Sequence, residues 1–216
     1  MLRVDDGRLV RGRRSRERIL TAARELFREQ GFDGATLRAI AARAGMGASS
    51  IYRHVRSKEE LLVEELAVRQ EEAWRRFRAA DDRSRPVRER LLAFFARQHE
   101  LLSEDADLTT IALRALTHPE ARVARRVLAL HDRTIGLLAE ILQSGRARGD
   151  LARDADVLLG ARALFHAALG ARIAWANGLL SAEGCAAGVA SSVELLFRGL
   201  AAPAARDPSG GSASAP

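Results

Sequence analysis

The spacing of apolar side chains predicts α-helices along almost the whole chain. From about residue 15 to Gly31 the first stripe recurs at intervals of three and four residues, as on one face of a helix, and it comprises Ile19, Ala22, Ala23, Leu26 and Phe27. Later stripes keep this spacing, and no stretch alternates apolar and polar residues as a half-buried strand does. The pattern therefore predicts an all-α protein of about nine helices.

Helix-capping residues place two short helices early in the chain. Thr36 is a good N-cap for a second helix, which stops at Gly45. A glycine turn then leads into a third helix from Ala48 to about His54. Two short helices joined by such a turn form a helix-turn-helix, which we place at about residues 36–55.

A long fourth helix links this small head to a larger body. The segment 57–60, Ser-Lys-Glu-Glu, has the pattern of a capping box, and the helix that it opens reaches about residue 82. Five further helices are predicted over about residues 86–103, 106–117, 119–148, 154–178 and 181–202. We therefore divide the chain into a flexible basic arm (1–14), a helix-turn-helix domain (15–60), a helical body (61–202) and a disordered tail rich in Pro, Gly and Ser (203–216).

Positive charge is concentrated in the first quarter of the chain. Residues 1–58 contain 13 arginines and one lysine against six acidic residues, whereas the remaining residues are close to neutral. A basic segment attached to a near-neutral body is typical of a nucleic-acid-binding protein. A solvated basic segment without a partner is the alternative that charge alone leaves open.

The composition argues against several other classes of protein. The longest apolar stretch, residues 155–180, is interrupted by Arg162, His166 and Arg172, so it does not predict a membrane helix. Cys185 is the only cysteine, and we expect a small buried side chain there, with a redox-sensing thiol as the alternative. No spacing of residues indicates a metal site, a cofactor or a catalytic centre. We therefore predict a cytoplasmic protein that is not an enzyme and has no membrane partner.

One contiguous stretch carries a more specific signal: RERILTAARELFREQGFDGATLRAIAARAGMGASSIYRHVRSKEELL, residues 16–62. It resembles the DNA-binding head of the TetR family of bacterial transcriptional regulators. The chain departs from that family at Gly47, where Ser or Thr usually caps the recognition helix, and at Val55, where an aromatic residue is usual. The resemblance implies a dimer whose third helices read DNA and whose bodies bind a small molecule.

Eight residues are predicted to contact double-stranded DNA: Thr36, Ala48, Ser49, Ser50, Tyr52, Arg53, His54 and Lys58. The small residues that begin the third helix would let its backbone enter the major groove, where Arg53 is long enough to reach a guanine or a phosphate. The resemblance assigns phosphate contacts to Tyr52 and His54 and places a lysine at position 58, whose compact ammonium suits a phosphate. Tyr52 could instead fill the core of the head, and Lys58 could be an ordinary capping-box residue.

Aromatic and histidine side chains in the middle helices predict a ligand cavity. An apolar pocket with a few polar groups is the usual form of such a site, and the candidate lining residues are Phe94, Phe95, His99, Leu113, His131, Phe165, His166 and Trp175. The last two helices alternate small and larger apolar residues, which permits close helix crossing. By resemblance they form a dimer interface, with packing inside one chain as the alternative; the candidate residues are Ala163, Ala167, Gly170, Ala171, Ala174, Ala190, Val193, Leu196 and Leu200.

These features together predict a homodimeric repressor that binds a palindromic operator and is released by a small, largely apolar effector. The resemblance implies that the effector shifts the long fourth helix and so changes the separation of the two heads. A non-specific or architectural DNA-binding protein without an effector is the alternative. A helical enzyme with a basic head is a third reading, which no constellation of residues supports.

Overall fold

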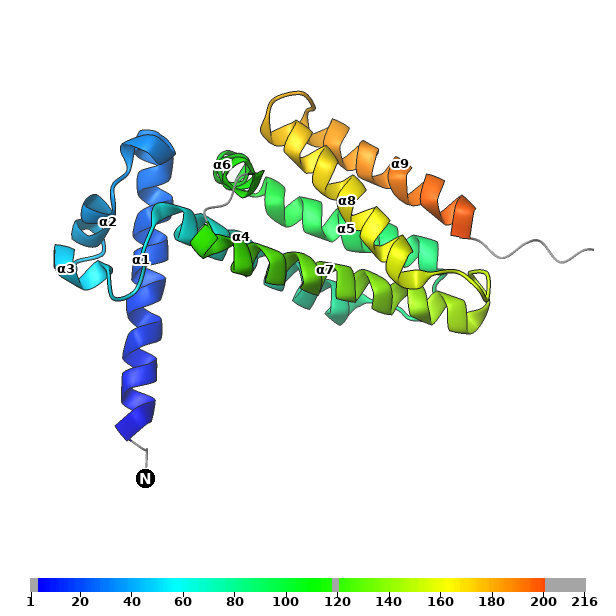
Figure 1. Cartoon of the computed structure of the whole chain (residues 1–216), viewed down its shortest axis with the longest axis horizontal. Helices are drawn as coiled ribbons and strands as arrows, with labels where there is room; N and C mark the ends of the chain where they lie inside the picture. Colours follow the sequence, from blue (N-terminus) through cyan, green and yellow to red (C-terminus); the bar gives the residue numbers. More distant parts are fainter. Residues whose placement is uncertain (1–3, 118–120, 201–216) are drawn as a thin grey trace, which may run out of the picture.

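The computed structural model describes residues 4–117 and 121–200, and Figure 1 shows these residues folded into helices. The helices are α1 (Val4–Gly34), α2 (Leu37–Arg43), α3 (Ala48–Ile51), α4 (Lys58–Ala80), α5 (Val87–Ser103), α6 (Ala106–Thr117), α7 (Ala121–Arg148), α8 (Val157–Ala176) and α9 (Ala182–Leu200). The all-α prediction is confirmed, and apart from the start of α1 and the end of α3 the nine helices of the described part lie close to their expected positions. The predicted tail at residues 203–216 lies outside the described residues.

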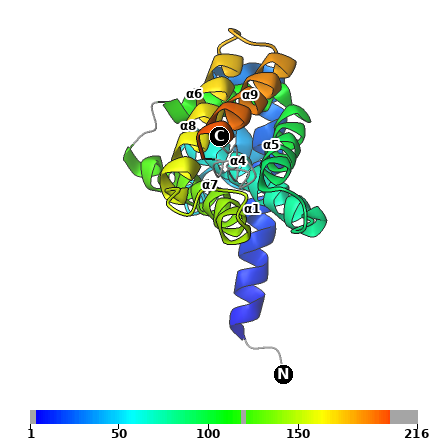
Figure 2. The same cartoon turned by 90° about the vertical axis from the view of Figure 1, so that its right-hand side faces the viewer.

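The helices form a small head and a larger body. The head consists of α1, α2 and α3, with α2 and α3 on the side that faces away from α5–α9 (Figure 1). α4 contacts α1 in the head and α5, α6 and α7 in the body, so it connects the two parts. In the body α8 packs against α7 and α9, and α9 packs against α5; Figure 2 shows this bundle end-on.

Apolar residues from the predicted stripes hold the head together. Ile19 in α1, Ile40 in α2 and Ile51 in α3 are fully buried. Val55, at the position where the family that the head resembles usually has an aromatic residue, is fully buried as well. Gly45 makes the turn between α2 and α3 with a φ of 64°, a conformation that glycine adopts without the strain other residues incur. The short helices are therefore fixed by tertiary packing and one glycine turn.

The N-terminal segment differs from the flexible arm that the sequence suggested, because α1 begins at Val4 and not near Ser15. Residues 10–14 of this helix are exposed or half-buried, and arginine is a good helix former. This part of the helix therefore extends without burying an apolar face. Figures 1 and 2 both show this part of α1 projecting beyond the other helices.

The third helix is shorter than expected and ends at Ile51 instead of His54. Its N-cap, Gly47, offers no side-chain hydrogen bond. After Ile51 the chain closes in a tight turn, in which the amide of His54 donates to the carbonyl of Ile51 at 2.9 Å and the amide of Arg53 to that of Ser50 at 3.3 Å. Such tightened bonds commonly satisfy the last carbonyls of a helix.

Among the described residues one helix, α8, is long and apolar enough to cross a membrane by length and composition. The core helix of a globular protein passes the same test. Here α8 packs against α6, α7 and α9, and it buries Leu164, Phe165 and Trp175 among them. These buried side chains belong to the core of the body, although only 33% of the apolar stretch is buried within the chain.

Gly145 allows α7 to approach the start of α5 closely. A Cβ atom at this position would lie 2.7 Å from the Cβ of Val87 and within 2.9 Å of both its methyl groups. Gly145→Ala is therefore expected to lower the free energy of unfolding by about 1–3 kcal/mol, the usual cost of overpacking a core. Denaturant unfolding followed by circular dichroism would measure this change.

The same helix provides a matched control, because Gly136 in α7 has no atom within 4 Å of its would-be Cβ. Gly136→Ala should stabilise the protein by up to about 1 kcal/mol, since alanine favours the helix. Equal effects of the two glycine substitutions would contradict the close contact.

Candidate DNA-binding surface and effector cleft

Two arginines of α1 fix the helix-turn-helix from behind. Arg18 donates through Nε to the carbonyl of Ala44, at the end of α2, at 3.0 Å. Arg16 donates through Nη1 to the carbonyl of His54, just after α3, at 2.6 Å. Arg16 also donates to the carboxylate of Glu64, which raises the pKa of Arg16 and ties α1 to α4. Cations are favourable at the carbonyl ends of helices, and these contacts set the position of α3 in the head.

The residues predicted to contact DNA lie on the exposed side of α3 and the turn after it. Ala48, Ser49 and Arg53 are exposed, and Tyr52 is 59% exposed. The alternative that Tyr52 fills the core of the head is therefore wrong. Arg53 donates through Nη2 to the hydroxyl of Ser50 at 3.2 Å, so its side chain lies along the same surface. This surface is available to a large partner.

Thr36 and His54 flank this surface. The hydroxyl oxygen of Thr36 accepts from the amide of Ala39 at 3.1 Å, as the N-cap prediction requires. Its hydroxyl hydrogen remains a donor that a phosphate oxygen could accept. His54 is half-buried in the turn after α3. Both residues are exposed enough to reach a DNA backbone laid along the surface.

Lys58, the only lysine, is engaged within the head. Its Nζ donates to the carbonyls of Phe32 at 2.7 Å and Asp33 at 3.4 Å, and it lies 4.5 Å from the centre of the Phe32 ring. The predicted capping box is also present, because Ser57 accepts from the amide of Glu60 at 3.3 Å. Lys58 therefore joins the start of α4 to the end of α1, a contact that the sequence analysis missed. Its third donor remains for the predicted phosphate.

Lys58→Ala is accordingly expected to act on stability as well as on DNA binding. Losing two hydrogen bonds from a charged donor at a half-buried site should lower the free energy of unfolding by about 1–2 kcal/mol. Thermal unfolding of the free protein measures this part. The effect on DNA binding is measured by the slope of log affinity against log salt concentration. The magnitude of this slope should fall by about one unit per head if the third donor binds a phosphate. An unchanged melting temperature would contradict the contact with α1.

Two sets of ion pairs connect the head with the body. Asp105, which is buried just before α6, accepts from Arg28 of α1 and, at 3.4 Å, from Arg69 of α4. At the other side of α4, Arg126 of α7 lies 2.6 Å from Glu60 in the first turn of α4. The first set links the residue before α6 to α1 and to the middle of α4, and the second links α7 to the start of α4. A rearrangement of the body therefore changes charged contacts of the head.

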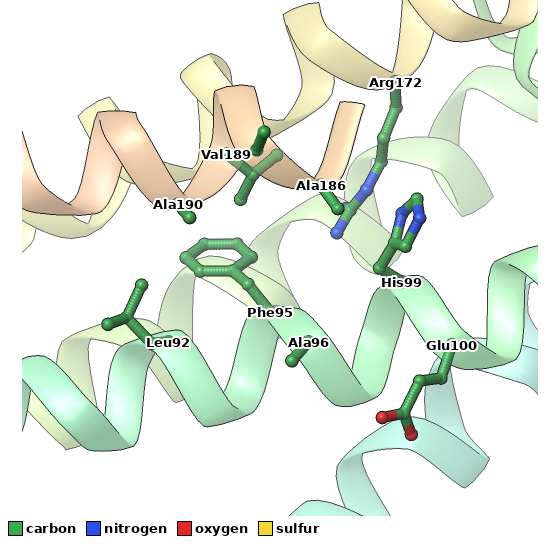
Figure 3. A pocket seen from close by; sticks show the side chains of 10 residues that line it. Leu92, Phe95, Ala96, His99, Glu100, Arg172, Ala186, Val189 and Ala190 are labelled. Atoms are coloured by element: carbon green, nitrogen blue, oxygen red, sulfur yellow. The ribbon is translucent and has the colours of Figure 1, made fainter. Parts of the chain in front are cut away.

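A cleft of about 460 Å³ lies between α5, α8 and α9 (Figure 3). Its walls are mainly apolar, and its lining consists of Leu92, Phe95, Ala96, His99, Glu100, Arg172, Ala186, Ala187, Val189 and Ala190. Figure 3 shows the ring of Phe95 between α5 and α9, with Arg172 and His99 at one end. Small-molecule sites usually have this size and this mixture of apolar walls with a few polar groups.

Arg172 is the least expected member of this lining, since it is only 4% exposed. Its Nη2 donates to Oε1 of Gln98 at 2.6 Å, whereas its buried Nε has no hydrogen-bond partner, and neither has Nε2 of Gln98. Burial lowers the pKa of Arg172 to about 10, so the guanidinium keeps its charge at neutral pH. In the sequence Arg172 stands out only as an interruption of an apolar stretch. Its spacing from Ala168 and Trp175 was the signal that places it on the buried face of α8.

Two of the eight predicted ligand-binding residues, Phe95 and His99, line the cleft. Trp175 lies against His99, with ring centres 5.5 Å apart. His131 lies against Phe165 at 4.8 Å, and burial lowers the pKa of both His99 and His131. The remaining candidates do not line it: Phe94, Leu113 and Phe165 are buried in the core, and His166 is exposed. Apolar spacing marks buried positions but cannot show which of them border empty space.

The predicted dimer surface on α8 and α9 is only partly exposed. Gly170 is exposed, and the half-buried candidates are Ala163, Ala167, Ala171, Ala174 and Leu196. Val193 is fully buried within its own chain, so its assignment to a dimer surface is wrong. Ala190 lines the cleft towards α5 instead. The side chain of Leu200 lies outside the described residues.

Two leucines that the sequence analysis did not single out are better placed on this outer face. Leu159 of α8 is 64% exposed and Leu195 of α9 is 73% exposed. α9 is amphipathic, and the side that holds Val193 faces the core while Leu195, two residues later, faces outwards. Large exposed leucines on adjoining helices are typical of a surface that a partner covers.

Comparison with known proteins shows to which family the chain is related. Residues 19–64 match the family model described as bacterial regulatory proteins, tetR family. The transcriptional repressor KstR of Rhodococcus jostii is 31% identical over 84% of this chain and 82% of its own length. The transcriptional regulator UidR of Escherichia coli is 27% identical over 72% of this chain and 79% of its own.

A solved structure agrees with these relatives. Thermus thermophilus FadR, a TetR-family transcriptional repressor crystallised with lauroyl-CoA, has a TM-score of 0.70 and 26% identity, covering 90% of this chain and all of that one. The match includes the body as well as the head, so the resemblance suggested by residues 16–62 extends over nearly the whole fold. The chain belongs to the TetR family of bacterial regulatory proteins and is a DNA-binding transcriptional regulator, not an enzyme.

Proposed function

We propose that the protein is a homodimeric repressor that binds a palindromic operator through two Ala48–His54 segments and leaves it when a small apolar effector occupies the body. The observation that carries this proposal is the exposed surface of α3, with Tyr52 and Arg53 free of the core. Arg16 and Arg18 hold that surface in place from behind. A protein that contacts the edges of DNA bases needs both an exposed helix face and a fixed backbone.

A dimer follows from the size of the head. One short recognition helix contacts few base pairs, whereas two heads on a two-fold axis read two half-sites about one helical turn apart. The exposed Leu159 and Leu195 support an interface on α8 and α9. This interface leaves α3 of each copy on the far side of its head, where Figure 1 shows it away from the body.

The cleft in the body supports regulation by a ligand. The related T. thermophilus FadR was crystallised with lauroyl-CoA, and an apolar cleft of about 460 Å³ suits an acyl chain. The effector must bind the DNA-incompetent arrangement more tightly than the competent one, because only this difference shifts the equilibrium. The ion pairs of Asp105 and Arg126 connect the body with the head and could transmit this shift.

An architectural DNA-binding protein would need neither the cleft nor the charged links between the body and the head. Fluorescence anisotropy at fixed salt separates the two functions, comparing the DNA upstream of the protein's own gene with a shuffled duplex of the same composition. We expect at least about a 10³-fold preference for the upstream region. Lauroyl-CoA is the first probe for release. Equal binding to both duplexes would overturn the proposed function.

A further inference from the structure

The cleft contains a positive charge that nothing in the described chain neutralises. Arg172 is 4% exposed and donates to one neutral acceptor, Oε1 of Gln98. Its Nε is buried without a partner, and among the described residues no carboxylate forms an ion pair with it. Glu100 lines the same cleft but is exposed and pairs with Arg97 at 2.6 Å. A buried charge without a counter-ion is unfavourable, and nearly all such groups in proteins are paired.

The surroundings of Arg172 define the group that would pair with it. Gln98 is fully buried and is not among the residues that line the cleft, but its Nε2 is a second buried donor without a partner. His99 does line the cleft and stands beside the guanidinium in Figure 3. Donors gathered around a permanent cation form a site for an anionic acceptor with more than one oxygen. Apart from Glu100, which pairs with Arg97, the remaining walls, from Leu92 and Phe95 to Val189 and Ala190, offer only apolar contacts. The ligand therefore has one anionic end and an apolar remainder.

We propose that the effector is a free carboxylate with an apolar body, such as a fatty acid, and that Arg172 binds its carboxylate while the tail lies between α5 and α9. This inference rests on the proposed function and names the chemical class of its effector. An acyl-CoA fits less well, because its thioester carbonyl is neutral and the phosphates of its coenzyme A lie at the far end of a long arm from the acyl chain. The lauroyl-CoA of the related repressor is thus expected to be the weaker ligand here.

The first test uses the unmodified protein and pairs of ligands that differ only in charge. Saturated fatty acids from hexanoate to palmitate are compared by isothermal titration with the primary alcohol and the methyl ester of each chain length. We expect the best carboxylate to bind about tenfold or more tightly than its neutral counterparts, as for hydrogen bonds to a charged group. Equal affinity within every pair, or no binding by any carboxylate, would overturn the proposal.

The second test removes the charge. Arg172→Met should abolish the preference for the carboxylate over the alcohol, while the free protein should unfold at the same or a higher temperature, since an unpaired buried charge is lost. Arg162→Met is the matched control, because it removes the same charge from an exposed position of α8 and should keep the preference. If Arg172→Met fails to fold, the ligand pairs with the unmodified protein still decide.

The two proposals fail in different ways. If lauroyl-CoA or an alcohol releases the operator and Arg172→Met responds as the unmodified protein does, the carboxylate inference is wrong and the ligand-released repressor stands. If no ligand alters DNA binding although carboxylates bind at Arg172, the regulatory part of the proposed function is wrong. Release of the operator by a carboxylate, lost in Arg172→Met and kept in Arg162→Met, supports both.

Discussion

Tyr52→Ala is expected to lower operator affinity by about a hundredfold or more while leaving the stability of the free protein unchanged. Tyr52 is 59% exposed, so its removal opens no cavity in the core. A tyrosine hydroxyl that binds a charged phosphate contributes about 1.5–3 kcal/mol. Two heads bind one operator, and the combined loss of about 3–6 kcal/mol corresponds to a factor of roughly 10² or more.

Fluorescence anisotropy with the operator and thermal unfolding without DNA measure the two halves of this expectation. Tyr52→Phe keeps the ring and loses only the hydroxyl, so it should show most of the loss if the phosphate bond dominates. Arg53→Ala serves as a contrast, because a base-reading arginine should change the preferred sequence, whereas a phosphate-binding residue weakens all sequences alike. An unchanged operator affinity in Tyr52→Ala would contradict a phosphate contact by this residue.

Asp105→Asn is expected to destabilise the protein and to weaken the link between body and head. The carboxylate of Asp105 is buried between Arg28 of α1 and Arg69 of α4. An amide of the same shape would turn a donor or a neutral oxygen towards two guanidinium groups. Removing one partner of a buried ion pair costs about 3–5 kcal/mol; because Arg28 is half exposed, we expect about 2–3 kcal/mol here.

Denaturant unfolding gives the stability change, and the effector concentration needed to release the operator gives the coupling. A loss of about 2–3 kcal/mol should lower the melting temperature by roughly 4–12 °C in a chain of this size. Asp107→Asn is the matched control, because Asp107 lies two residues later on α6 and is exposed. Identical melting temperatures for the two variants would show that Asp105 does not bind head to body.

The head was largely predictable because its signals are local. Thr36 and Ser57 cap their helices as expected, and Gly45 makes the expected turn. The family resemblance identified the exposed segment that follows it. Lys58 shows the limit of this reasoning: its partners, the carbonyls of Phe32 and Asp33, lie 26 and 25 residues earlier, and no local pattern connects them.

The helices of the body could be predicted from the sequence, but the residues that line its cleft could not. Eight residues were chosen for the cavity, and Phe95 and His99 line the cleft while others fill the core. Val193 and Ala190 were assigned outwards, although they face their own chain. Periodicity states which residues share one face of a helix, but a body helix has several neighbours, and only packing decides which neighbour each face meets.

Local signals along the chain were sufficient to predict the all-α fold, the helix-turn-helix and the family, because helix spacing, caps and glycine turns act over a few residues. Which groups meet across the chain depends on how the helices pack. Arg172 and Gln98 are 74 residues apart, and their contact leaves a buried cation beside an apolar cleft. Neither residue alone predicts this unpaired cation, because the absence of a counter-ion depends on all the groups that surround the guanidinium.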